Sequence, residues 1–387
     1  MSNITRCDPI AFSQDLIRKP SITPVDAGAL DYLQTHLESL GFVCTRYPFG
    51  EGEDRVDNLY ARLGKQAPNF CYAGHTDVVP VGDETKWRFP PFEARIADGK
   101  LWGRGAADMK GSIAAFTAAV TNLLAEGWRP TGSISFLITG DEEGPAVNGT
   151  DKLLGAITEV GEVIDHCLVG EPTNPNQMGE MIKNGRRGSL NAKIKVTGQQ
   201  GHVAYPHRAI NPVPVLMDLV TRLQSWHLDD GNPFFQPSNL EITSIDVGNP
   251  AHNVIAETAT AKFNIRFNTL HRGDDLKAHI EKLANETRKT TKAVIETDLR
   301  VTGEAFLTTP CAFTDIVQTA VEARTGRRPE LSTSGGTSDA RYITHFAPVV
   351  EFGLVGATIH QVNEHSDTDD IQLLTEIYQQ ILKDYFR

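Results

Sequence analysis

Three short runs of the sequence are largely apolar along their whole length, and they constrain the fold most strongly. The runs are NFCYAGH (69–75), SISFLIT (133–139) and HCLVG (166–170). A strand that is apolar on both faces is typical of a parallel sheet covered by helices on both sides. Stretches with helical spacing accompany them at 26–42 and 109–126. The sequence therefore predicts an α/β fold with a mostly parallel mixed sheet flanked by helices.

The hydrophobic pattern changes near residue 185 and changes back near residue 300. In between, apolar and polar residues alternate along the strands, which is typical of a sheet with one solvent-exposed face. The elements follow the order strand, helix, strand, strand, helix, strand, as in a ferredoxin-like α+β module. We therefore expect a catalytic domain in two parts, 1–180 and 298–387, and an inserted domain at 181–297. Because an open sheet has free edges, we expect a homodimer formed through the inserted domain.

Composition limits the partners and the compartment. The chain has 387 residues and a net charge of -12, which argues against nucleic acid or an anionic membrane as the main partner. No apolar run is long enough to span a bilayer, and the opening MSNITRCDPIAF shows no secretory signal. The five cysteines are dispersed and form no CxxC pair, which is typical of reduced thiols. We therefore expect a cytoplasmic protein.

Acidic and histidine residues gather where predicted strands end or helices begin. These residues are His75, Asp77, Asp108, Glu142, Glu143, Glu171 and His360. Alone, each has an ordinary explanation, such as a helix N-cap for Asp108 or a helix-dipole partner for Glu142 and Glu143. In an open α/β sheet, however, side chains beyond the carboxyl ends of the strands converge. So many carboxylates would repel one another unless cations lay among them, and carboxylate with imidazole fits zinc, cobalt or manganese in a hydrolytic site.

Five strings carry a resemblance to a known family: AGHTDVVP, GRGAADMKG, GDEEG, GEPT and HQVNE. In this order they resemble the successive motifs of the dinuclear-zinc aminoacylase/carboxypeptidase family, and the match runs nearly end to end. The resemblance implies that Asp108 bridges two divalent metal ions, zinc or alternatively cobalt. It implies that His75 and Glu171 complete one metal site. Glu143 and His360 would complete the other.

The same resemblance implies catalytic roles. A metal-bridged water would be the nucleophile and Glu142 its general base, while Asp77 would hold the His75 ring by a hydrogen bond. His202, in GQQGHVAYPH, resembles the histidine that donates to the oxyanion, in dimers from the other subunit. Without the resemblance, a surface histidine in a turn is the better explanation of His202. A cis peptide bond is implied between Asp108 and Met109.

Three longer strings, KNGRRGSL, GQQGHVAYPH and STSGGTSDAR, resemble one branch of the family. That branch hydrolyses the amide of N-succinyl-LL-2,6-diaminopimelate to succinate and LL-2,6-diaminopimelate in lysine and diaminopimelate biosynthesis. Arginine forks suit the carboxylates of this small anionic substrate. The substrate-binding residues implied are Arg186, Tyr205, Asn253, Arg266, Gly336, Thr337 and Ser338. A solvated charge is the alternative for Arg266, and a flexible loop is the alternative for SGGTSD.

Two positions depart from the pattern. Gly356 stands where relatives have asparagine, which affects one substrate contact. His365 is a second candidate metal ligand, but His360 opens the H-x-x-N-E string and is chosen, so His365 is expected at the surface. The alternatives in function are a deacylase for another N-acyl amino acid, such as acetylornithine, and a metallo-dipeptidase. A further alternative is a non-catalytic binding protein with the same fold.

Overall fold

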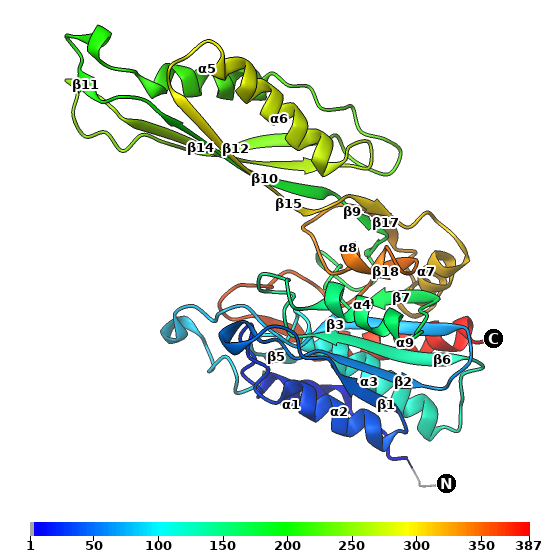
Figure 1. Cartoon of the computed structure of the whole chain (residues 1–387). Helices are drawn as coiled ribbons and strands as arrows, with labels where there is room; N and C mark the ends of the chain where they lie inside the picture. Colours follow the sequence, from blue (N-terminus) through cyan, green and yellow to red (C-terminus); the bar gives the residue numbers. More distant parts are fainter. Residues whose placement is uncertain (1–3) are drawn as a thin grey trace. The chain divides into compact units, whose positions relative to one another are not determined.

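The computed structural model describes residues 4–387 and divides them into two compact units (Figure 1). The first unit comprises the chain up to Asn184 together with Thr308–Ser332 and Ser338–Arg387. The second comprises Gly185–Leu307 and Thr333–Thr337. It extends past the expected boundary at 297, because strand β15 (Val294–Gly303) runs on and β16 (Phe306–Leu307) pairs with β9 (Gly185–Arg186).

An eight-stranded mixed sheet lies at the centre of the first unit, in the order β1-β2-β6-β3-β7-β18-β8-β17. Its middle strands β6, β3, β7 and β18 run parallel, and β1 and β2 add an antiparallel edge. Every residue of β3 and β6 is buried, as their apolar runs predict. The strands are β1 (Val43–Arg46), β2 (Leu59–Leu63), β3 (Asn69–His75), β6 (Ser133–Thr139), β7 (His166–Val169), β8 (Met181–Lys183), β17 (Glu330–Ser332) and β18 (Val349–Glu351). The predicted α/β architecture is confirmed.

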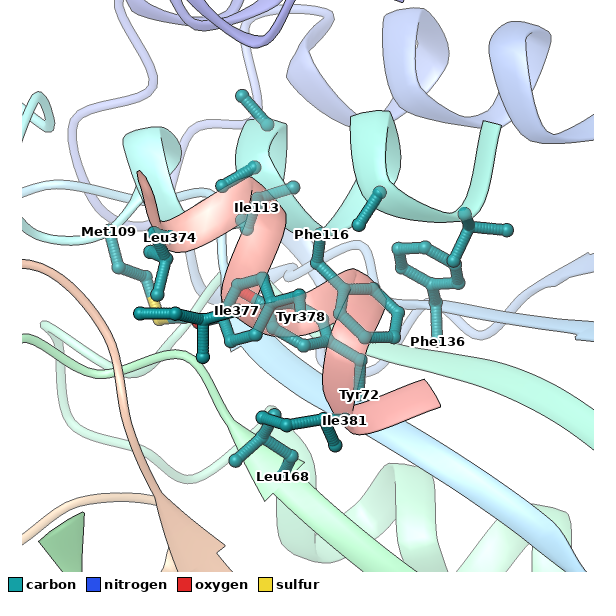
Figure 2. Packing of buried hydrophobic residues seen from close by; sticks show 14 of the residues in the cluster. Tyr72, Met109, Ile113, Phe116, Phe136, Leu168, Leu374, Ile377, Tyr378 and Ile381 are labelled. Carbon is teal, nitrogen blue, oxygen red and sulfur yellow. The ribbon is translucent and has the colours of Figure 1, made fainter. Parts of the chain in front are cut away.

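Helix α3 (Lys110–Ala125) is the centre of the packing in this unit. It lies between α1 (Pro9–Ile17) and α9 (Thr368–Tyr385), and α7 (Ala312–Thr325) packs on α9 in turn. All residues of α3 except Asn122 and Ala125 are buried. Figure 2 shows the core that it forms with β3 and α9, where the rings of Tyr72 and Phe116 stack with centroids 4.2 Å apart. Because α3 is held on all sides, the loop before it has a fixed anchor. The remaining helices of eight or more residues in this unit are α2 (Ala29–Ser39) and α4 (Thr150–Glu159).

The second unit contains a four-stranded antiparallel sheet in the order β12-β14-β10-β15. Its helices α5 (Pro212–Gln224) and α6 (Gly273–Arg288) cover one face (Figure 1). The apolar face of β10, with Leu190 and Ile194 fully or almost fully buried, packs towards these helices. The chain order matches the expected ferredoxin-like module. The other strands are β10 (Gly188–Thr197), β12 (Asn239–Asp246) and β14 (Thr258–Phe267).

The last strand of the central sheet is short. The apolar run PVVEFGLV (348–355) pairs as β18 only over Val349–Glu351. Beyond it the chain follows the segment after β7 so closely that a Cβ on Gly353 would lie 2.3 Å from the carbonyl oxygen of Gly170. After Glu351 this close approach takes the place of further strand pairing, and the chain continues towards His360. Across residues 4–387, no helix is long and apolar enough to cross a membrane.

Candidate functional site

The sheet topology brings the acidic and histidine strings to one edge. His75 is the last residue of β3, Glu142 and Glu143 follow β6, and Glu171 follows β7. These three strands are parallel neighbours, so their carboxyl ends lie side by side. The adjacency of the strands therefore explains why residues far apart in the sequence share one site.

Asp108 lies between two histidines. Its Oδ1 is 3.2 Å from His75 Nε2, and its Oδ2 is 3.4 Å from His360 Nε2. Asp108 is not the helix N-cap, because Met109 occupies that position and no side chain caps α3. The peptide bond between Asp108 and Met109 is cis, as the resemblance implied. The two oxygens of one carboxylate thus face two separate groups of donors.

Those two groups have the composition of metal sites. One is His75, Asp108 and Glu171, and the other is Asp108, Glu143 and His360, with the donor atoms of each group within 4.8 Å of one another. Glu171 Oε1 lies 3.6 Å from His75 Nε2, and Glu143 Oε1 lies 3.0 Å from His360 Nε2. A third overlapping group joins His75 to Glu142 and Glu143. Only the His360 side chain is half exposed, which leaves one side of the site open.

The electrostatics of the site fit added positive charge. Burial raises the pKa of Glu171 well above its usual range, and the nearby carboxylates of Asp108 and Glu142 raise it further. Burial also raises the pKa of Glu142. Hydrogen bonds to Asp108 and Glu143 raise the pKa of His360 to about 10. Such shifts mark an excess of negative charge, which divalent cations would offset, so the donor set fits a metal centre.

Asp77 contacts both the His75 ring and the loop that carries the glutamates. The closest acceptor for His75 Nδ1 is the backbone carbonyl of Asp77 at 2.9 Å, whereas the Asp77 carboxylate is 3.5 Å away. That carboxylate instead accepts hydrogen bonds from the backbone N–H groups of Glu142, at 3.3 Å, and Glu143, at 3.1 Å. Asp77 therefore orients the ring through its backbone and orients the glutamate pair through its side chain.

Three buried acidic residues around the site were not singled out from the sequence. Asp141 accepts from the backbone N–H groups of residues 146–148 and shapes the loop after the glutamates. Asp339 accepts the hydroxyl proton of Thr150 at 2.6 Å. Glu364 binds the loop that carries Asp108. Each lies inside one of the strings that resemble family motifs, and that was the only signal for them in the sequence.

The two departures have local explanations. Both ring nitrogens of His365 have partners, since Nδ1 lies 2.8 Å from the carbonyl of Asn363 and Nε2 lies 2.8 Å from Lys100 Nζ. The ring lies against Trp102 and is partly exposed, and His365 is in none of the donor groups. At Gly356, a Cβ would meet the carbonyl oxygen of Pro172 at 3.1 Å, so a side chain there would fit tightly.

Three predicted residues of the second unit lie close together. Strand β11 (Gly201–His202) pairs with β13 (Val254–Ile255), and Val203 N–H donates to the carbonyl of Asn253. The rings of His202 and Tyr205 are 5.7 Å apart, and both side chains and Asn253 are exposed. The structure thus gathers His202, Tyr205 and Asn253 around the two-stranded sheet of β11 and β13.

The remaining predicted substrate residues are more dispersed. Arg186 donates to the carbonyl of Gly336 at 3.1 Å, which joins β9 to the stretch containing Thr337. Arg266 lies on β14 opposite Ser189. Burial and the adjacent charge of Arg187 lower the pKa of Arg266. Ser338 is in the first unit, and it is buried with its hydroxyl donating to Glu351 at 2.7 Å.

Comparison with known proteins decides the family. The model of peptidase family M20/M25/M40 matches residues 71–384. The chain belongs to this family. It is 61% identical over 380 residues to a succinyl-diaminopimelate desuccinylase of Maricaulis maris, covering 98% of this chain and 96% of the relative. A protein of the same name from Rhodospirillum centenum is 60% identical, covering 98% of this chain and 97% of the relative.

Solved structures of M20 proteins share the fold. A metallo-carboxypeptidase from Sulfolobus solfataricus matches 98% of this chain and 99% of its own with a TM-score of 0.80 at 17% identity. The aminopeptidase PepT from Bacillus cereus matches 98% of each chain with a TM-score of 0.79 at 18% identity. The predicted family is therefore confirmed, and this M20 chain is an enzyme of the hydrolase class with a site suited to metal ions.

Proposed function

We propose that this M20 enzyme hydrolyses the amide bond of N-succinyl-LL-2,6-diaminopimelate, which releases succinate and LL-2,6-diaminopimelate. The observation that carries the proposal is the identity of 60–61%, over nearly the whole length of both chains, to relatives named for this reaction. The arrangement of donors around Asp108 supports the metal-dependent chemistry that the reaction needs.

The donor groups suggest how two cations would be held. His75 and Glu171 would hold one, Glu143 and His360 the other, and Asp108 would contribute one oxygen to each. Zinc is the metal we propose, with cobalt as the alternative, because the donors are imidazole and carboxylate without thiolate. When bound, such ions supply Lewis-acid polarisation of a carbonyl and acidification of water.

Glu142 is the proposed general base. It follows β6 directly, and its Oε2 is 4.0 Å from His75 Nε2, farther than the oxygens of Asp108 and Glu171. It belongs to neither group that shares Asp108. A carboxylate beside the donors can accept a proton from water and return it to the leaving amine. Glu143 Oε1 lies closer to the neighbouring histidine, His360, at 3.0 Å, so the adjacent glutamates have separate roles.

His202 is the proposed donor to the oxyanion. Its Nδ1 accepts a hydrogen bond from the backbone N–H of Ala204 at 3.1 Å. The neutral ring therefore carries its proton on Nε2, which makes that atom a donor. The His202 side chain is exposed, so Nε2–H can reach a ligand.

Substrate binding is assigned to the polar residues that the family resemblance implies. We propose that Arg186 and Arg266 bind carboxylates of the substrate through their guanidinium forks. Hydrogen bonds would come from Tyr205, Asn253, Gly336, Thr337 and Ser338. Because the hydroxyl proton of Ser338 is donated to Glu351, Ser338 would act towards substrate as an acceptor or through its backbone.

The assembly and compartment are also proposals. We propose a homodimer through the second unit, because β12 and β15 are the edge strands of its sheet and β12 has no partner beyond β14 within the described residues. We place the reaction in the cytoplasm, since all five cysteines are unpaired thiols.

A substrate panel tests the proposed function. Succinate release from N-succinyl-LL-2,6-diaminopimelate is compared with deacylation of N-acetylornithine and with cleavage of a dipeptide, each as kcat/KM. We expect kcat/KM for the succinyl substrate to exceed that for each of the other two by at least about 100-fold. A site built to bind a second carboxylate leaves an arginine without a partner when the substrate lacks that carboxylate. A higher kcat/KM for acetylornithine or the dipeptide would reject the substrate assignment.

A further inference from the structure

Glu364 is fully buried and binds four donors from the loop that ends at Asp108. Its Oε1 accepts from the backbone N–H groups of Gly105 at 3.1 Å, Ala107 at 2.9 Å and Asp108 at 3.1 Å. Its Oε2 accepts from Arg104 Nη1 at 2.8 Å. The exposed fraction of the Glu364 residue is 1%. One carboxylate therefore fixes almost every residue of the turn before α3.

Arg104 completes this anchor from the other side. Its exposed fraction is 2%, and besides Glu364 it donates to the carbonyls of Gln361, at 3.1 Å, and Pro80, at 3.3 Å. Its guanidinium lies over the Trp87 ring, with Cζ 5.2 Å from the ring centroid. Arg104 thus spans both the Asp108 loop and the segment that leads from His360 to Glu364. Removing one member of a buried pair of this kind leaves the other charge uncompensated, so each residue depends on its partner.

The segment between His360 and Glu364 has an unusual backbone. His360 and Asn363 both adopt positive φ, at 60° and 67°. Residues other than glycine adopt this region at a cost, so neighbouring contacts must hold them there. Those contacts include the Asn363 side chain, which accepts from the N–H of Arg88, and the backbone bond from Gly103 N–H to the Glu364 carbonyl at 3.0 Å.

We propose that Glu364 is a positioning residue that holds the shared carboxylate of Asp108 and the imidazole of His360 at the spacing that two cations need. It lies in the same short segment as His360 and bonds directly to the backbone of Asp108. It offers no oxygen to the donor groups themselves. This inference rests on the proposed function, because it concerns the proposed metal centre. The positioning role explains why a glutamate ends the string HQVNE.

The test measures zinc binding as well as activity. Metal-free wild-type and Glu364→Gln enzymes are titrated with zinc by calorimetry in the presence of a competing chelator. Glutamine keeps one oxygen for the backbone donors but loses the charge that faces Arg104. We expect zinc affinity to fall by about 10- to 100-fold, the usual effect of losing an outer partner of metal ligands. We also expect kcat to fall while KM changes little.

A control separates positioning from general loss of stability. Asp165 accepts from the N–H of Asn69 at the beginning of β3, at the opposite end of the strand from His75. Asp165→Asn should lower the thermal midpoint and leave zinc affinity unchanged. If Glu364→Gln does not fold, the test uses Arg104→Lys instead. Lysine keeps the positive charge but lacks the guanidinium fork, so this variant should also bind zinc more weakly.

The outcomes distinguish the two proposals. Wild-type zinc affinity in the folded Glu364→Gln enzyme, or in Arg104→Lys when that variant is used, would overturn the positioning role. Failure of the wild-type enzyme itself to bind zinc or cobalt would reject the proposed function instead. Weaker zinc binding in the variant together with unchanged binding in Asp165→Asn would support the inference.

Discussion

The carboxylate of Asp77 accepts a hydrogen bond from the backbone N–H of Glu143 at 3.1 Å. A second bond, from Glu142 N–H at 3.3 Å, reaches the other oxygen. These bonds join the end of β3 to the end of β6 and set the direction in which the two glutamate side chains leave the backbone. One side chain is directed to His360 and the other to the side of His75. Asp77 thus helps to orient side chains beside both donor groups, the one that contains His75 and the one that contains His360.

Asp77→Ala should therefore reduce catalysis without removing any donor of the metal groups. Small displacements of groups around a reacting centre cost about 100-fold in rate. We expect kcat to fall by about that factor, with zinc affinity reduced as well. Steady-state kinetics and metal analysis measure both. Asp83→Asn, which alters an exposed acid that caps a surface turn, is the control. Wild-type kcat in Asp77→Ala would show that the loop needs no such support.

Substitutions of the adjacent glutamates should have different effects. Glu142→Gln should lower kcat by about 10²- to 10⁴-fold, the range for loss of a general base, while two zinc ions per chain remain bound. Glu143→Gln should lose zinc, because its oxygen belongs to the group with Asp108 and His360. The zinc content and the turnover number of the two purified variants are measured and compared. Equal loss of zinc in both would identify Glu142 as a ligand.

Stability at acid pH should depend on Asp229 in the second unit. Burial alone would raise the pKa of Asp229, but hydrogen bonds from Ser238, Gly231 and Asn268 outweigh it and lower the pKa to about 2. The unfolded value is about 3.9, so the folded protein prefers the charged form. The stabilisation is complete above about pH 5 and is lost as the pH falls through about 4 towards 2.

Asp229→Asn tests this dependence. The difference in free energy of unfolding between wild type and variant should be constant from pH 7 to 5 and should shrink between pH 4 and 3. Urea unfolding at each pH measures it. A difference that stays constant down to pH 3 would show that the stabilisation does not come from the charge of Asp229.

The aromatic core beneath the site should contribute strongly to stability. Phe116 is fully buried, stacks on Tyr72 and meets the Phe136 ring edge to face with centroids 5.2 Å apart (Figure 2). Phe116→Ala should lower the free energy of unfolding by about 3–5 kcal/mol. Val43→Ala, at a position that is 69% exposed, should change it by less than about 0.5 kcal/mol. Similarly small changes in the free energy of unfolding in both variants would mean that neighbouring side chains fill the space left by the Phe116 ring.

Much of the fold followed from patterns that burial leaves in the sequence. The strands with two buried faces, β3 and β6, are largely apolar runs, and α3 lies within the predicted helical stretch 109–126. The convergence of His75, Glu142 and Glu171 followed from one topological rule on parallel strands. Short edge strands were not predicted, because β1 has only partly buried and exposed residues and so carries no apolar signal.

Contacts to the backbone could not be predicted from side-chain patterns. The sequence identified Asp77 but not that its carboxylate binds the glutamate loop, since a backbone N–H is the same for every residue except proline. Glu364 was missed as an anchor for the same reason, and its partners lie about 260 residues away in the chain. The candidate metal donors could be singled out because metals need particular side chains, whereas the residues that hold such donors in place need only a suitable position.

The most direct test of the metal-dependent mechanism is turnover of N-succinyl-LL-2,6-diaminopimelate during metal removal and return. The enzyme is stripped with a chelator, its metal content is measured, and zinc is restored in steps. The metal centre proposed here predicts no turnover without metal and full turnover at two equivalents of zinc per chain, with thermal stability rising as the buried carboxylates gain their counter-charge. Turnover that survives complete removal of metal would contradict it.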